Sequence, residues 1–147
     1  MDNLTPEKRS WLMSQVKGSN TTPELIVRKF LHSRGYRYGL HNKTLPGKPD
    51  IVLRKIKTIV LVHGCFWHGH EGCQKARLPK TRRLWWQQKR SYNLDKDLRD
   101  RQALKALGWR VITIWQCDLS SKKVQSTLRR LEKKIELNKA KTTHPFI

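Results

Sequence analysis

The chain has few acidic residues for its length: 11 Asp and Glu stand against 32 Lys and Arg among 147 residues, for a net charge of +21. The basic residues are spread from Lys8 to Lys141, so no single run accounts for the excess. The simplest explanation is a polyanionic partner, and nucleic acid is the leading candidate. The alternatives are a structural binder of the ribosomal or chromatin type and a membrane-surface protein.

Other shortages narrow the class further. No stretch of about 18 apolar residues exists, so we expect no membrane span, and residues 1–10 lack the apolar segment of a signal peptide. The three cysteines are an odd number, which argues against a disulfide framework and favours a reducing cytoplasm, where cysteine spacing more often indicates metal. Repeats and Gly/Ser-rich linkers are absent, so we expect one domain over 1–137 and a mobile tail over 138–147.

Helical and strand patterns alternate along the chain. Helices are predicted at 5–17, 22–33, 93–107 and from Ser120 or Ser121 onward, and strands at 36–38, 50–53, 58–62 and 109–115. Thr22 is the expected N-cap of the second helix, with Pro23 at its first position. Leu94, Leu98 and Leu104 are expected on the core face of the third. This order predicts an α/β sandwich in which helices flank a small sheet, and it leaves the strand order open.

Residues 63–73 hold three of the six histidines and two of the three cysteines. Cys65, His70 and Cys73 are soft ligands at the short separations that tetrahedral zinc accepts. Cys117, which follows a predicted strand, is the remaining cysteine and completes a Cys₃His set. The alternative is three unrelated buried cysteines and a surface histidine, because free cysteine is often a small core residue.

A carboxylate and two further histidines suggest a second kind of site. Asp50 opens a predicted strand, where it can hold Mg²⁺ together with water and phosphate oxygens. The Glu-x-Lys that nucleases usually carry on the next strand is replaced here by Leu-Val-His at 61–63. His63 or His68 can take the place of the lysine, since a histidine with a pKa near neutrality can deprotonate an attacking water. The alternative is that Asp50 is a turn residue.

Aromatic residues adjoin these candidates. Phe66 and Trp67 lie between the predicted ligands, and Trp85 and Trp86 lie in a basic segment. Aromatic rings on a basic surface stack on bases or insert between base steps, although core packing is the alternative for each ring. Trp109 and Trp115 follow a strand pattern and are expected in the core.

Several motifs, in their order, resemble the very short patch repair (Vsr) endonuclease family. They are Met13 to Glu24, Leu-Pro-Gly-Lys-Pro-Asp at 45–50, Val-His-Gly-Cys-Phe-Trp-His at 62–68, and Gly108 to Cys117. The resemblance covers roughly residues 6–135. It implies an α/β fold like that of restriction endonucleases, a three-layer sandwich with a central mixed sheet and a structural zinc site. It also implies a strand-specific, Mg²⁺-dependent endonuclease that nicks duplex DNA 5′ to the thymine of a T·G mismatch left by deamination of 5-methylcytosine.

The resemblance assigns roles residue by residue. Asp50 and the carbonyl of Val62 would bind Mg²⁺, His68 would be the general base, His63 would support the scissile phosphate or a metal-bound water, and Glu24 would orient a histidine or a metal-bound water. Zinc would be held by Cys65, His70, Cys73 and Cys117. The mismatched DNA would be contacted by Met13, in a helix within 1–20, and by Phe66, Trp67, Trp86, Lys89 and Asn93.

The expected partners are duplex DNA with a T·G mismatch and mismatch-repair proteins. We expect a monomer in the bacterial cytoplasm, at the nucleoid. Two alternatives stay open at this point. One is a zinc-stabilised DNA-binding module without catalysis. The other is a restriction-type endonuclease of the same fold that needs no mismatch.

Overall fold

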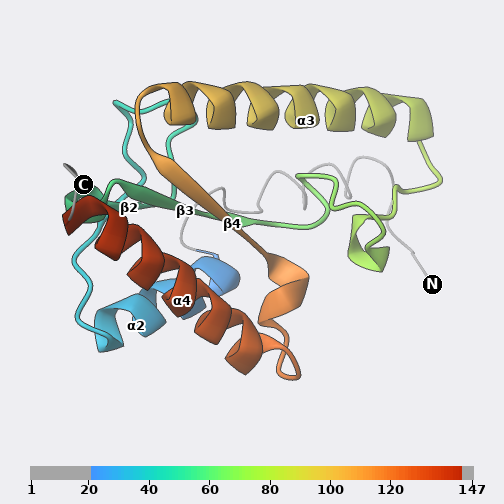
Figure 1. Cartoon of the computed structure of the whole chain (residues 1–147). Coiled ribbons are helices and arrows are strands. Elements are labelled where there is room, and N and C mark those ends of the chain that lie inside the picture. The colour runs from blue at the N-terminus through green and yellow to red at the C-terminus, as the bar shows by residue number, and fades with distance from the viewer. Residues whose placement is uncertain (1–20, 144–147) are drawn as a thin grey trace.

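The computed structural model of the chain describes residues 21–143 and contains a four-stranded mixed sheet of order β1-β2-β3-β4. The strands are β1 (Gly39–Leu40), β2 (Ile51–Leu53), β3 (Thr58–His63) and β4 (Arg110–Trp115). Strand β2 pairs antiparallel with β1 and β3, whereas β3 and β4 are parallel (Figure 1). The predicted strands from 50, 58 and 109 are thus confirmed to within a residue or two.

The strand predicted at 36–38 was wrong, and the first strand lies at Gly39–Leu40 instead. The two tyrosines that gave the pattern its strand character turn toward helices. Tyr38 donates its hydroxyl to the carbonyl of Arg28 at 3.2 Å, and Tyr36 donates to Glu136. Their rings pack against the core beneath the sheet.

Helices cover both faces of the sheet. They are α2 (Thr22–Ser33), α3 (Arg83–Ala106) and α4 (Val124–Thr143), with short 3₁₀ turns η1 (Arg54–Ile56), η2 (Gln74–Ala76) and η3 (Gln116–Leu119). Because side chains alternate along a strand, Ile51 and Leu53 face α2 and α4, whereas Val52 and Ile59 face Leu104 of α3. The result is three layers, with α3 on one side of the sheet and α2 and α4 on the other (Figure 1).

Helix α2 spans the predicted residues 22–33, but its N-cap lies one residue before the predicted one. Thr21, not Thr22, is the N-cap, and its hydroxyl accepts from the N–H of Glu24 at 3.4 Å. This cap places Glu24 in the first turn, where its side chain is 2% exposed. The start of α2 therefore delivers a buried carboxylate to the sheet.

Helix α3 differs from its prediction in length and in orientation. It begins at Arg83, ten residues before the predicted start, and Leu94 and Leu98 are 44% and 48% exposed instead of facing the core. The face turned to the sheet carries polar residues between its buried ends, Trp86 and Leu104. Tertiary contacts of these polar side chains stabilise the first half of α3, and an apolar stripe does not reveal them.

Helix α4 continues to Thr143, past position 138 at which a mobile tail was predicted. Asn138 donates to the hydroxyl of Thr58 at 3.1 Å and accepts from Arg110 through its carbonyl at 2.8 Å. The hydroxyl of Thr142 donates to the carbonyl of Ile56 at 3.3 Å. These polar contacts fix the last turns of α4 against the sheet. The predicted helix at 5–17 lies outside the described residues.

Candidate active site and metal centre

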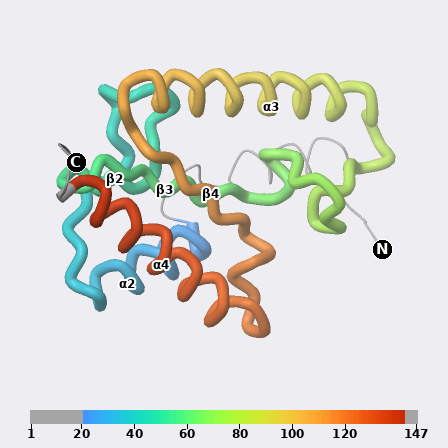
Figure 2. The backbone as a smooth tube through the Cα atoms, in the orientation of Figure 1, coloured from blue at the N-terminus to red at the C-terminus, as the bar shows by residue number. Residues whose placement is uncertain are grey.

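Three strand ends meet at one edge of the sheet. Strand β2 starts there because it runs antiparallel to β3, and β3 and β4 both end there because they are parallel, with His63 opposite Trp115. Segments far apart in the sequence are thereby brought side by side, as the backbone trace shows (Figure 2). All the predicted site residues within the described part of the chain lie at or beside this edge or on the adjoining part of α3.

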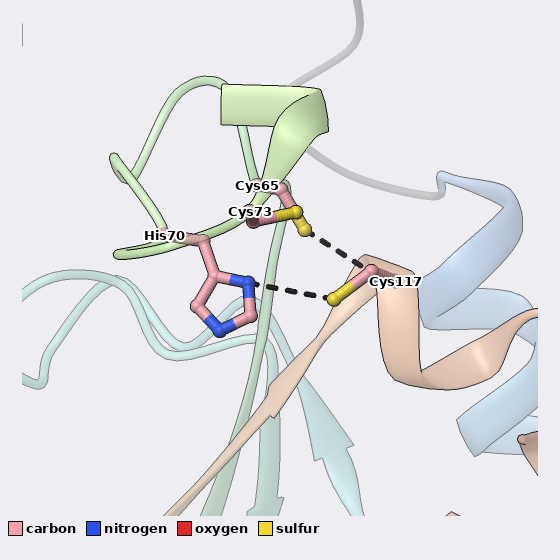
Figure 3. Close-up of side chains that lie close together, drawn as sticks. All are labelled: Cys65, His70, Cys73 and Cys117. Atoms are coloured by element: carbon pink, nitrogen blue, oxygen red, sulfur yellow. Dashed lines mark hydrogen bonds between the residues drawn. The ribbon is translucent and has the colours of Figure 1, made fainter. Parts of the chain in front are cut away.

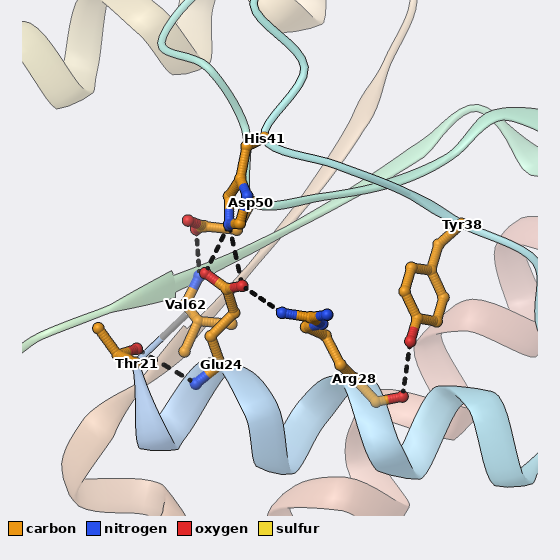
Figure 4. Close-up of polar contacts among 7 residues, drawn as sticks. All are labelled: Thr21, Glu24, Arg28, Tyr38, His41, Asp50 and Val62. Carbon is orange, nitrogen blue, oxygen red and sulfur yellow. Dashed lines mark hydrogen bonds and ion pairs between the residues drawn. The ribbon is translucent and has the colours of Figure 1, made fainter. Parts of the chain in front are cut away.

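The first group, here called the acid cluster, consists of Glu24, His41 and Asp50, which offer ligand atoms within 4.8 Å of one another (Figure 4). His41 Nε2 lies 3.0 and 2.9 Å from the two carboxylate oxygens of Glu24. Asp50 Oδ2 accepts from the N–H of Val62 at 2.9 Å. Burial raises the pKa of Asp50 to about 6, and the neighbouring Glu24 carboxylate adds to the rise. A bound cation would offset both the cost of burying the charge of Asp50 and its repulsion by the Glu24 carboxylate.

His41 was not singled out from the sequence. The expected partner of Glu24 was a histidine or a metal-bound water, and the structure gives it this histidine from the segment between β1 and β2. The backbone of His41 has a positive φ of 45° and donates to the carbonyl of Asp50 at 3.1 Å, so it is fixed beside the carboxylate. Nothing local in the sequence marks this conformation.

The second group, here called the histidine–aspartate cluster, consists of His63, His68 and Asp97. His68 Nδ1 lies 2.6 Å from Asp97 Oδ2, and since a carboxylate only accepts, Nδ1 carries the proton. Nε2 is then the basic nitrogen of His68. Asp97 was not singled out from the sequence. The available signal was that acidic residues follow Asn93 at helical spacing in a chain with few acidic residues.

His63 is buried, at 5% exposed, and its ring stacks on that of His68 with centroids 3.8 Å apart. Burial and the neighbouring His68 together lower the pKa of His63 to about 3, so the ring is neutral. Among the described residues its Nδ1 has no hydrogen-bond partner. A buried nitrogen without a partner is what a ligand-binding group shows before its ligand arrives.

A cavity of about 250 Å³ joins the two clusters, and it is lined by Pro46, Gly47, Asp50, Val62, His63, His68, Lys96, Asp97 and Asp100, among others. Gly47 has a positive φ of 76°, and a Cβ there would lie 2.7 Å from Asp100, so only glycine fits the turn against α3. Carboxylate oxygens, imidazole nitrogens and the unpartnered Nδ1 of His63 fit a divalent cation and a phosphate group.

The third group, here called the thiol cluster, consists of Cys65, His70, Cys73 and Cys117, whose ligand atoms all lie within 4.8 Å of one another. Cys117 Sγ lies 3.4 Å from His70 Nδ1, and its N–H donates to Cys65 Sγ at 3.4 Å (Figure 3). A tetrahedral zinc ion requires ligand atoms roughly 3.5–3.8 Å apart. The structure thus brings together all four predicted ligands in an arrangement that could hold zinc.

The predicted DNA-contacting rings form a compact group next to the thiol cluster. The ring centroids of Phe66 and Trp67 lie 5.2 Å apart, and those of Phe66 and Trp86 lie 5.3 Å apart. Trp86 is only 7% exposed, so it supports the other two rings from behind, while Trp85 beside it is 43% exposed.

Lys89 and Asn93 lie on α3 beside the same aromatic group. Asn93 donates its amide to the carbonyl of Trp67 at 2.9 Å, and Arg90 donates to the carbonyl of Phe66 at 3.1 Å. Helix α3 therefore fixes the loop that carries both rings. Met13 lies outside the described residues.

Trp109 and Trp115 have different surroundings. Trp109 is 6% exposed and packs in the core, as predicted. Trp115 is only half-buried and lies between His63 and His70, which corrects its assignment to the core.

A mixed sheet with an acidic strand start and a histidine at the end of the next strand fits a restriction-endonuclease-like fold, and endonucleases are the class of protein for which such a site is suited. A family model described as "DNA mismatch endonuclease Vsr" matches residues 1–75. The chain belongs to this Vsr endonuclease family, as its sequence motifs predicted, and is a hydrolase that acts on phosphodiester bonds. In the described part of the chain, no helix is long and apolar enough to cross a membrane.

Relatives extend the similarity over most of the chain. The chain is 53% identical over 119 residues to the type II nicking enzyme V.XorIIP of Xanthomonas oryzae pv. oryzae, which covers 81% of this chain and 87% of that protein. It is 41% identical over 136 residues to V.NmeAIP of Neisseria meningitidis, covering 92% and 96%. It is 35% identical over 111 residues to the DNA mismatch endonuclease Vsr of Escherichia coli, covering 76% and 70%.

Proposed function

We propose that this endonuclease nicks one strand of duplex DNA 5′ to the thymine of a T·G mismatch, in a Mg²⁺-dependent reaction of very short patch repair. The observation that carries the proposal is that Asp50 and His68 line one cavity, beside a loop that presents Phe66 and Trp67. The proposed nuclease site thus lies next to aromatic rings that can insert at a weakened base step.

Asp50 and the carbonyl of Val62 would hold Mg²⁺, which when bound neutralises negative charge that develops on the phosphate. His68 takes a proton from water through Nε2, while Asp97 keeps Nδ1 protonated and the ring oriented. The water oxygen bonds to phosphorus as the P–O3′ bond breaks, and the departing O3′ takes a proton from solvent. The products are a 5′-phosphate and a 3′-hydroxyl. Neutral His63 would donate a hydrogen bond to the phosphate or accept one from a metal-bound water.

Mismatch selection rests on the cost of opening a base step. A mismatched pair costs less to unstack than a matched one, so a rigid aromatic loop enters it preferentially. Phe66 and Trp67 would make this contact, with Trp86 behind them, Lys89 and Asn93 beside the mismatched pair and Met13 on the minor-groove side. The net charge of +21 supplies the backbone attraction that any duplex would share.

The decisive test is a panel of otherwise identical duplexes with a T·G, T·A or C·G pair, with Mg²⁺ supplied or withheld. We expect single-strand nicking of T·G with Mg²⁺, and rates on matched duplexes lower by about 100-fold, because a few kcal/mol separate the opening costs. Equal rates on T·G and T·A would favour a sequence-specific nicking enzyme without a mismatch requirement. The nicking-enzyme relatives support this alternative. Nicking that persists without any divalent cation would refute the metal assignment.

We further propose that the thiol cluster holds one structural Zn²⁺ per chain. Metal analysis of the purified protein is expected to give one zinc, and Cys117→Ser is expected to lose it and to lower the thermal unfolding midpoint by about 10 °C, since loss of a structural metal costs several kcal/mol. The matched control is His32→Ala, which removes an exposed imidazole outside every cluster. A protein without zinc, or a Cys117→Ser variant that retains it, would contradict the site.

The setting follows from the proposed substrate and from the bacterial relatives. We place the enzyme in the cytoplasm at the nucleoid, acting as a monomer on double-stranded DNA. Mismatch-repair proteins are the class of partner that would receive the nicked product.

A further inference from the structure

Aromatic rings form a continuous path between the histidine–aspartate cluster and the thiol cluster. His68 stacks on His63, and His63 meets the ring of Trp115 edge-on, with centroids 5.2 Å apart and planes at 77°. Trp115 in turn stacks on His70, with centroids 4.1 Å apart and planes at 10°. One indole thus contacts a histidine from each cluster.

The residues after Trp115 contact the same loop. Gln116 Oε1 accepts from the N–H of Cys65 at 3.4 Å, and Cys117 contacts His70 and Cys65. Three consecutive residues, the last of β4 and the first two of η3, therefore hold the segment between His63 and His70. Of these three, only Trp115 reaches the histidines on both sides.

The ring of His63 depends on this packing for its orientation. A histidine ring is usually oriented by a hydrogen bond to one of its nitrogens, as Asp97 orients His68. His63 Nδ1 has no such partner among the described residues, so stacking by His68 and the edge of Trp115 set its plane. Offset and edge-to-face contacts of this kind have preferred geometries, so moving one ring moves the next.

We propose that Trp115 is a positioning residue that sets His63 and His68 according to the placement of His70 in the thiol cluster. The proposal rests on the proposed function, in which His68 acts on water and His70 binds zinc. It gives the metal centre a role beyond loop stability, because the imidazole that binds the metal also sets the plane of Trp115. The catalytic histidines then occupy their working positions only when His70 is held.

The first test compares Trp115→Leu with Trp115→Phe in the full chain. Trp115→Leu is expected to lower kcat for T·G nicking about tenfold with KM nearly unchanged, and to shift the imidazole NMR signals of His63 and His68. Trp115→Phe keeps a ring and is expected to restore both readouts. The matched control, Trp109→Leu, removes a core indole next to the same strand and is expected to lower stability without moving the imidazole signals. Unmoved signals in Trp115→Leu would overturn the proposal.

The second test, His70→Cys, is independent of substitutions at Trp115. Cysteine keeps four zinc ligands but removes the ring that stacks on the indole. The variant is expected to retain one zinc and still to show lower kcat and shifted His63 and His68 signals. A zinc-loaded variant with wild-type kcat and signals would overturn the coupling. If the wild-type protein nicks no T·G duplex, the proposed function fails, while the NMR comparison still decides the role of Trp115.

Discussion

Asp50→Asn is expected to reduce nicking of a T·G duplex by about 1,000-fold or more, because a metal-binding carboxylate contributes several kcal/mol to transition-state stabilisation. Binding of the same duplex should change little, since the side chain keeps its size and the surrounding positive charge is unaltered. Asparagine can still accept from the N–H of Val62. It also avoids the cost of burying a charged carboxylate, which raises the pKa of Asp50 to about 6, so the fold should not be weakened. Single-turnover nicking and fluorescence anisotropy measure the two quantities.

The matched control for this substitution is Asp95→Asn, which neutralises an exposed aspartate of α3 away from the cavity. Its nicking rate should equal that of the wild type. Wild-type nicking by Asp50→Asn would remove Asp50 from the active site. Loss of DNA binding together with nicking would instead make it a structural residue.

His68→Ala should lower kcat by about 100- to 10,000-fold, the usual contribution of a general base. The zinc content should be unchanged, because His70 and not His68 belongs to the thiol cluster. Asp97→Asn should have a smaller effect, since it alters the orientation and the preferred tautomer of His68 without removing the base. Rapid-quench nicking at saturating protein isolates this step from binding.

The pair of variants discriminates between two assignments of the base. A larger loss for Asp97→Asn than for His68→Ala would identify the carboxylate as the proton acceptor. The exposed His32→Ala variant controls for loss of an imidazole elsewhere. If His68→Ala nicks as fast as the wild type, water activation at this site requires another group.

Much of this architecture was predictable because local sequence patterns indicate it. The apolar run at 58–62 is rich in β-branched residues and indicates a buried strand, and residues 109–115 also follow a strand pattern. The thiol cluster was predictable because soft ligands are rare and three of the four are close in sequence. Pairing β3 with β4 then brings Cys117 to the other three.

Helix α3 and His41 escaped prediction because their placement depends on tertiary contacts. Leucines at helical spacing suggested a core face for α3, yet the helix turns its polar side inward to line the cavity. This orientation of α3 gives His68 a hydrogen-bonding partner. Helix propensities carry no information about such a contact. His41 is carried to Glu24 by a left-handed backbone conformation that its neighbours in sequence do not signal.

The parallel pairing of β3 with β4 also determines at which stage of its synthesis the chain can form the proposed nuclease site. Cys65 and Cys117 are 52 positions apart, and helix α3 must be made before β4 can dock. A nascent chain that has delivered Asp50 and His68 from the ribosome still lacks the strand that holds their loop. We therefore expect the chain to become able to cut DNA only after β4 has docked, and a chain truncated before Arg110 to be unable to nick DNA.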